Sequence, residues 1–230
     1  LMMTMTQKNK LNIMEISCRS DIGGGPEQLF KIITNLKHAF TFYCACPDQE
    51  PYYNKIINEG IPVFKLPHRK FEIRSFLALL KWTKVNGIMI VHSHGRGAGV
   101  YARLLKLFNK RLKVVHNFHG IHIEKKGLAL IVARLLGVLT NKFVLVSRSE
   151  QQIAVKYGLA SASKCVLIEN GIQIENGKQI EREELPVSEV FFESLPPDRF
   201  VIGMLSRFDI IKNIPYAIRS LSDYMKSHDD

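Results

Sequence analysis

The chain has 230 residues, of which 46% are hydrophobic and 23% are charged, a composition typical of a globular protein rather than a disordered one. Its formal net charge of +11 favours a phosphorylated or polyanionic partner. The sequence lacks zinc-finger spacing, an aromatic RNA-binding strand motif and a disordered basic arm, so nucleic acid is not expected as that partner.

Short apolar runs rich in β-branched residues alternate with helical patterns along most of the chain. This alternation is typical of β-α units on a parallel sheet. Residues 1–10 show no periodicity and are expected to form a disordered leader. The predicted strands are 11–17, 40–46, 63–66, 88–92, 113–117, 143–146 and 166–168, and the predicted helices are 27–36, 53–59, 73–85, 97–108, 128–140 and 149–157. We therefore predict an α/β fold, with a doubly wound, Rossmann-like parallel sheet over residues 11–172.

A second domain is expected to begin near the end of the chain. Residues 173–198 contain six glutamates and three prolines and are predicted to form a linker. The pattern then restarts, with a strand over 200–205, a loop over 206–212 and an amphipathic helix over 214–225. One β-α unit cannot bury both faces of its strand, so residues 199–230 are expected to be the start of a truncated, second Rossmann-like domain.

A glycine-rich loop follows the first predicted strand and has the sequence Gly23-Gly24-Gly25-Pro26-Glu27. Glycines let a backbone approach a ligand, and a helix N-terminus offers unpaired N–H groups with partial positive charge. Pro26 is expected at the first helical position. The loop has neither the third glycine of the dinucleotide fingerprint nor the Gly-Lys-Ser/Thr of a P-loop. A phosphate-binding turn and a turn without a ligand both remain open.

Histidines follow the next two predicted strands, in the segments His92-Ser93-His94-Gly95 and His116-Asn117-Phe118-His119-Gly120. The carboxyl ends of neighbouring parallel strands line one crevice, so these histidines are expected to converge on one cleft.

Three interpretations of the histidines compete. A metal site would use His92 and His94, with His116, His119 and His122 as further donors, but these segments supply no carboxylate before Glu124, and no metal is expected. Alternatively, the rings only make structural hydrogen bonds. In the third interpretation His119, beside the flexible Gly120, hydrogen-bonds a bound sugar and the charge that develops on it.

In combination these segments resemble retaining glycosyltransferases of the two-Rossmann-domain type (GT-B), the family-4-like group related to bacterial lipopolysaccharide and mannosyl transferases. The glycine loop resembles that family's Gly-Gly-x-Glu loop, and His119 its catalytic-centre histidine. The other matching segments are 92–95, 144–147, 166–172 and 202–208 with Lys212 and Asn213. Glu169, Ser206 and Asn213 depart from the family pattern, which has proline at the first of these positions and glycine at the other two.

The resemblance implies transfer of a sugar from a nucleoside diphosphate sugar to a saccharide or lipid-linked acceptor, with retention of configuration and without a metal or other cofactor. The resemblance implies that His119 is the catalytic residue. The implied donor phosphate ligands are Gly24, Gly25, Arg207 and Lys212, and the implied cleft residues are His92, His94, Ser147 and Asn170. The family's paired glutamates lie deep in the second domain, so this chain is expected to have little activity alone.

Three alternatives remain open: a nucleotide-sugar epimerase of the same architecture, a metal-dependent hydrolase, and a non-catalytic remnant or binding module. The basic helices 73–85 and 97–108 favour an acceptor at an anionic membrane surface. The four cysteines are interpreted as free thiols, which are typical of a reducing compartment. The expected location is therefore the cytoplasm, with peripheral contact at the inner face of the membrane.

Overall fold

The computed structural model describes residues 10–121, 127–171, 202–204, 206, 208 and 210–227. The chain divides into two units after Ile172. The first unit contains a seven-stranded sheet in which every pair of neighbouring strands is parallel. This confirms the predicted doubly wound, Rossmann-like α/β fold. The predicted leader, apart from Lys10, and the predicted linker lie outside the described residues.

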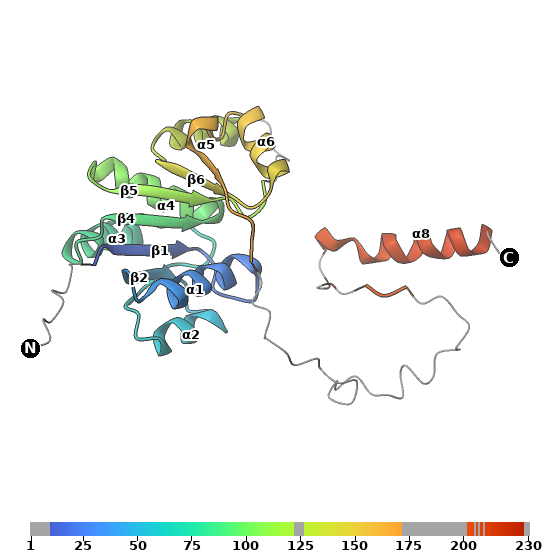
Figure 1. Ribbon diagram of the computed structural model, residues 1–230, viewed down its shortest axis with the longest axis horizontal. Coiled ribbons are helices and arrows are strands. Elements are labelled where there is room, and N and C mark those ends of the chain that lie inside the picture. Colours follow the sequence, from blue (N-terminus) through green and yellow to red (C-terminus); the bar gives the residue numbers. More distant parts are fainter. Residues whose placement is uncertain are drawn as a thin grey trace, which may run out of the picture. The chain divides into compact units, whose positions relative to one another are not determined.

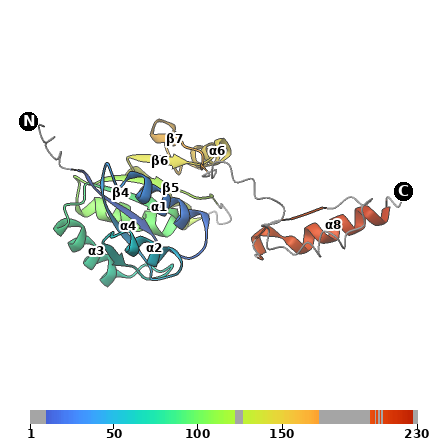
Figure 2. The same cartoon turned by 60° about the horizontal axis from the view of Figure 1, so that its bottom comes forward.

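The strand order is β3-β2-β1-β4-β5-β6-β7, and β2, β1, β4, β5 and β6 follow one another from bottom to top in Figure 1. The strands β6 and β7 lie together with the helix α6 at one end of the sheet (Figure 2). Each predicted strand of this domain is confirmed to within two residues. The strands are β1 Asn12–Ser17, β2 Thr41–Cys46, β3 Val63–Lys65, β4 Ile90–His94, β5 Lys113–Asn117, β6 Lys142–Leu145 and β7 Cys165–Leu167.

Helices cover both faces of the sheet. On one face, Leu29 and Ile33 of α1 join a core cluster with Ile13 of β1. On the other face, Tyr101 and Leu105 of α4 join a cluster with Met14. Because β1 is covered on both sides, its last five residues are buried, and they include Ile13, Met14 and Ile16. The helices are α1 Gly24–Leu36, α2 Tyr52–Asn58, α3 Ile73–Val85, α4 Gly95–Phe108, α5 Leu128–Val138, α6 Arg148–Lys156 and the short η1 Ala162–Lys164.

Among the element boundaries that differ from the sequence-based prediction, two at the carboxyl edge of the sheet bear on the site. The helix α1 begins at Gly24, so Pro26 is its third residue and not its first. This position still costs no hydrogen bond, because the first four N–H groups of a helix have no intrahelical acceptor. The strand β4 continues to His94, because it pairs there with Ser17 on one side and with Asn117 on the other.

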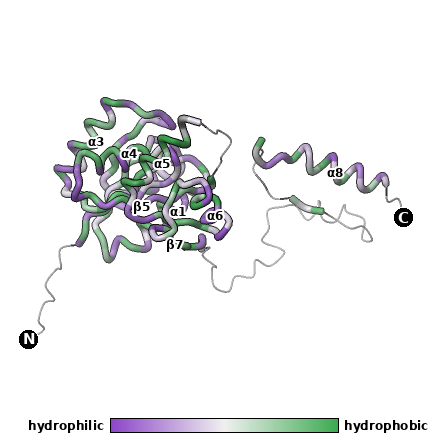
Figure 3. Tube along the Cα trace, turned by 90° about the horizontal axis from the view of Figure 1, so that it is seen from above, coloured by the Kyte–Doolittle hydropathy of each residue, from purple (hydrophilic) through white to green (hydrophobic). Residues whose placement is uncertain are grey.

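The second unit contains a 3-10 turn, η3 Ile210–Lys212, and the helix α8 Ile214–Ser227. The predicted helix is confirmed, and hydrophobic and hydrophilic positions alternate along it in Figure 3. The predicted strand is not found in its described part, residues 202–204. A strand needs a neighbour to complete its backbone hydrogen bonds. In the described parts of both units, no helix combines the length and apolar character that a membrane crossing requires.

Gly99 of α4 is a packing constraint, since a Cβ there would lie 2.7 Å from Cε1 of His116 and 2.8 Å from Nη1 of Arg103. Both neighbouring side chains are buried. We expect Gly99→Ala to lower the free energy of unfolding by about 1–3 kcal/mol, measured by urea denaturation. Leu107→Ala, at an exposed position of the same helix, is the control and should change it by less than about 0.5 kcal/mol. Equal stability of the two variants would contradict this packing.

Candidate functional site

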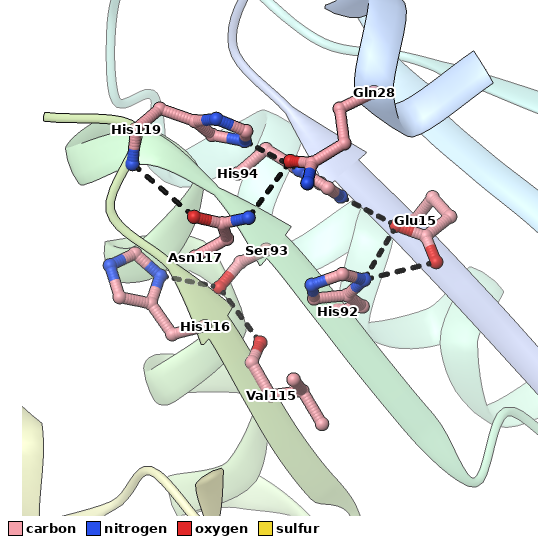
Figure 4. A network of polar contacts seen from close by, with 9 residues as sticks. All are labelled: Glu15, Gln28, His92, Ser93, His94, Val115, His116, Asn117 and His119. Carbon is pink, nitrogen blue, oxygen red and sulfur yellow. Dashed lines mark hydrogen bonds and ion pairs between the residues drawn. The ribbon is translucent and has the colours of Figure 1, made fainter. Parts of the chain in front are cut away.

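The candidate site lies where β1, β4 and β5 end side by side. Glu15 pairs in register with His92, and His94 pairs with both Ser17 and Asn117. Side chains two residues apart on a strand share a face of the sheet. The register therefore brings Glu15, His92 and His94 onto the face that α1 covers, and Figure 4 shows the carboxylate of Glu15 in contact with both rings.

Glu15 is a buried carboxylate, with a relative exposure of 1%. Its Oε2 lies 2.7 Å from Nε2 of His94 and 3.1 Å from Nδ1 of His92. Burial by itself raises the pKa of Glu15, but attraction to His92 and hydrogen bonds from His92 and His94 outweigh burial and lower this pKa to about 2. Glu15 is therefore ionised at neutral pH. Sequence reasoning missed it, because it stands between the apolar residues Met14 and Ile16 of a predicted buried strand.

His119 joins this cluster from the loop after β5. Its Nε2 lies 2.8 Å from Nδ1 of His94, and the two rings are stacked. His119 has a positive φ of 55° and Gly120 one of 99°, and these left-handed conformations turn the ring back over the edge of the sheet. Burial, followed by repulsion from the neighbouring rings, lowers the pKa of His94 and lowers that of His119 to about 3. Both rings are therefore neutral at pH 7.

The glycine loop lies against this histidine. A Cβ on Gly25 would be 3.6 Å from the His119 ring, whereas one on Gly24 would meet nothing within 4 Å. The start of α1 leaves the amides of Gly24 and Gly25 without an intrahelical acceptor. The structure thus brings the predicted phosphate-binding turn and the predicted catalytic histidine together. Arg19, which sequence reasoning missed, also lies near Gly23 and forms an ion pair with Asp21.

Three amide side chains connect the elements around the site. Asn117 Nδ2 donates to Gln28 Oε1 at 2.8 Å, and Gln28 Nε2 donates to Asn170 Oδ1 at 2.7 Å. Asn117 Oδ1 accepts from the backbone N–H of His119 at 3.4 Å. Asn170 was predicted here, but its partner Gln28 was not. The network ties the end of β5 and the turn after β7 to α1.

Glu150 of α6 anchors the loop that carries His119. Its carboxylate is buried and accepts from the N–H of Gly120 at 2.8 Å and from the N–H of Val146 at 2.9 Å. Ser147, predicted at the cleft, is the N-cap of α6 and accepts from the N–H of Glu150. Its direct contacts are therefore structural, and it supports the site through Glu150.

Not every predicted site residue meets the others. His92 lies one pleat further from the edge than His94, and only 13% of its side chain is exposed, so it supports Glu15 and does not line a cleft. His116 points to the opposite face, where Nδ1 lies 2.9 Å from Ser93 Oγ. Burial, with repulsion from Arg103, lowers the pKa of His116 well below its ordinary value. The prediction that all these histidines converge on one cleft is therefore wrong for His116.

The structure does not place three other predicted residues at this site. Lys212 belongs to the second unit, and Arg207 and His122 lie outside the described residues.

The donor atoms of Glu15, His92 and His94 lie within 4.8 Å of one another, and these residue types also bind divalent metals. The strand β1 therefore supplies the carboxylate that the histidine segments lack. In the described geometry, however, both ring nitrogens of His94 are engaged, one by Glu15 and the other by His119. A metal would have to displace these contacts, so we interpret the cluster as a chain of hydrogen bonds.

Comparison with known proteins gives a consistent result. The sequence profile of Glycosyltransferase Family 4 matches residues 28–176. The chain is 24% identical over 192 residues to the O-antigen biosynthesis glycosyltransferase WbnH of Escherichia coli, a match that covers 80% of this chain and 57% of that protein. The chain thus spans little more than half the length of this relative.

The solved structures with a similar fold include the following two. A glycosyltransferase from Rickettsia africae superimposes with a TM-score of 0.58 at 19% identity, over 72% of this chain and 44% of that chain. Alr3699/HepE of Anabaena, solved in complex with UDP and glucose, gives a TM-score of 0.59 at 16% identity, over 70% of this chain and 45% of that chain. At these identities the likeness is one of fold.

The neutral buried histidines predict acid sensitivity. Their pKa values are lowered in the folded state, so this stabilisation is complete above the unfolded value near 6.5 and is lost as the pH falls below it. The lowered pKa of Glu15 adds a further loss of stability when the pH falls below about 4.5. We expect the free energy of unfolding, measured with urea, to fall between pH 7.5 and pH 4.5.

The variant His119→Asn removes one of the titrating groups and keeps a residue that tolerates positive φ. We expect it to reduce the slope of stability against pH. The exposed His68 provides the matched control, and His68→Asn should leave the slope unchanged. A His119→Asn slope equal to that of the unsubstituted protein would show that the pKa of His119 is the same in the folded and unfolded states, against the lowered value.

Proposed function

Because the chain belongs to glycosyltransferase family 4, we propose that the whole protein transfers a sugar from a nucleoside diphosphate sugar to a saccharide or lipid-linked acceptor, with retention of configuration. The observation that carries this proposal is the contact between the glycine turn of α1 and the ring of His119. The similarity to an O-antigen glycosyltransferase and to a structure with bound UDP and glucose supports these substrate classes and a role in cell-envelope polysaccharide synthesis.

In this proposal the N-terminus of α1 binds a phosphate group of the donor. The free amides of Gly24 and Gly25 supply hydrogen bonds, and the helix dipole supplies partial positive charge. Arg207 and Lys212 of the second unit would add cations to the growing negative charge of the leaving diphosphate. No metal is required for these roles. The guanidinium of Arg19 would lie 3.7 Å from a Cβ on Gly23, but it is paired with Asp21.

His119 would contact the sugar itself. It is neutral, it is fixed at one end by His94, and it stands directly beside Gly25. A neutral ring hydrogen-bonds a sugar hydroxyl without adding charge to the site. His94, Ser147 and Asn170 hold this arrangement in place, with His92 behind them.

The proposed function also assigns a role to each part of the chain. Residues 11–172 would form the acceptor-binding domain, 173–198 the linker, and 199–230 the beginning of the donor-binding domain. Closure of two domains on the diphosphate would exclude water and favour transfer over hydrolysis. The 230-residue chain alone is then expected to turn over little donor.

A surface on α3 supports a peripheral membrane contact at the cytoplasmic face. Ile73, Leu77 and Val85 are 70%, 55% and 76% exposed. The exposed cations Arg74, Lys81 and Lys84 follow at spacings of seven and three residues, on the same side of the helix as Leu77. Apolar side chains among cations match the boundary of an anionic bilayer. Such a surface would bring the enzyme to a lipid-linked acceptor.

The transferase proposal is tested by sugar transfer from labelled nucleoside diphosphate sugars to lipid-linked saccharides, with the longest protein that the gene encodes. We expect a product with the donor's anomeric configuration, and a fall of about 100-fold or more in kcat for His119→Ala. The exposed His38 provides the control His38→Ala, which should keep full activity.

Four results would contradict this proposal. A product of inverted configuration would exclude the retaining mechanism. An isomerised nucleotide sugar formed without an acceptor would identify an epimerase. Hydrolysis that a chelator abolishes would identify a metal-dependent hydrolase. Absence of any turnover in the longest protein would favour a non-catalytic binding module.

The membrane proposal is tested by co-sedimentation of the 230-residue chain with vesicles. We expect binding to vesicles that contain phosphatidylglycerol and much weaker binding to neutral phosphatidylcholine. Reversal of Arg74, Lys81 and Lys84 to Glu should abolish the difference. The control variant replaces the exposed Lys55, Lys142 and Lys156 with Glu, so that the two triple variants carry the same net charge. Equal binding to both vesicle types, or an equal effect of the two triple variants, would refute the assignment to α3.

A further inference from the structure

The polar contacts of the site form a line from the inside of the sheet to its edge. Glu15 contacts His94 at 2.7 Å, and His94 contacts His119 at 2.8 Å. The members come from β1, β4 and the loop after β5, and the line is visible in Figure 4. Such a line has only a few ways of distributing its hydrogens, because every contact needs one donor and one acceptor.

The carboxylate of Glu15 determines which atom carries the hydrogen in its contact with His94. An ionised carboxylate only accepts hydrogen bonds, so Nε2 of His94 carries the hydrogen between them. Nδ1 of His92 carries the hydrogen of its own contact with Glu15 for the same reason. Glu15 thus receives two ring N–H groups, which satisfies a charge that would otherwise be costly to bury.

The second contact follows from the first. His94 is neutral and has already placed its hydrogen on Nε2, so its Nδ1 has a lone pair and accepts. The hydrogen in the contact with His119 must then belong to Nε2 of His119. This leaves Nδ1 of His119 bare. Within the described part of the chain, that nitrogen has no hydrogen-bond partner.

We infer that Glu15 and His94 are positioning residues that hold His119 in a single tautomer, with hydrogen on Nε2 and with Nδ1 as a free hydrogen-bond acceptor. A bare nitrogen accepts from a hydroxyl group but repels a phosphate oxygen. The ring would therefore select a sugar hydroxyl and leave the phosphate to the amides of α1. This role in transfer rests on the proposed function, whereas the tautomer itself does not.

The tautomer is tested directly by long-range ¹H–¹⁵N NMR spectra of the histidine rings in the 230-residue chain. These spectra distinguish a protonated ring nitrogen from a bare one. We expect Nε2–H and bare Nδ1 on both His94 and His119, and a scalar coupling between the two nitrogens that share the hydrogen. Hydrogen on Nδ1 of His119 would overturn the inference without any variant.

The dependence on Glu15 is tested with Glu15→Gln, whose amide can donate as well as accept. We expect the single His119 tautomer to be replaced by a mixture. The control is Ser93→Ala, which removes a buried hydroxyl from the opposite face of β4 and should leave the His94 and His119 spectra unchanged. A well-folded Glu15→Gln protein with the original tautomer would show that the carboxylate does not set it.

Kinetics separate this inference from the proposed function. In the longest protein that the gene encodes, Glu15→Gln should lower kcat by about tenfold or more, since loss of the group that orients a catalytic histidine has large effects, and should leave KM for the donor within about twofold. An unchanged kcat would overturn the positioning role. The expected NMR spectra without any sugar transfer by the unsubstituted protein would refute the proposed function alone.

Discussion

The site depends on one buried negative charge. Glu15 lies inside the sheet, where an unpaired carboxylate would be strongly destabilising. Two imidazole N–H groups from β4 stabilise it. The same contacts fix the rotation of both rings, and His94 transmits this order to His119 at the surface. The buried charge must be satisfied for the fold to be stable. The hydrogen bonds that satisfy it thus also determine how the ring of His119 is oriented at the edge of the sheet.

The parallel sheet makes this arrangement compact. All its strands end on one edge, so β1, β4 and β5 deliver side chains to one place although they are distant in sequence. The loop after β5 needs further support, because His119 and Gly120 both adopt positive φ. Glu150 holds its backbone at Gly120, and Asn117 holds it at His119. This positive-φ segment is thus tied to the regular elements around it.

The described first unit offers a phosphate mainly neutral groups. The amides of α1 and the neutral ring of His119 can donate or accept hydrogen bonds, and the guanidinium of Arg19 is already paired with Asp21. A doubly charged diphosphate would need additional cations. This deficit accords with the proposed division of labour, in which Arg207 and Lys212 of the second unit supply them and the first unit orients the sugar.

The amino-acid sequence by itself determined the order of strands and helices in the first unit, because β-branched apolar runs and amphipathic periods are local signals. It also identified the glycine loop and His119, since glycines mark the turns that follow strands. It did not reveal Glu15, Gln28 or Glu150 as site residues, and it assigned His116 to the wrong face. The contacts of Glu15 with His92 and of Gln28 with Asn170 join residues 77 and 142 positions apart. Only the register of the assembled sheet decides such contacts, because a one-residue shift between strands reverses the face that each side chain occupies.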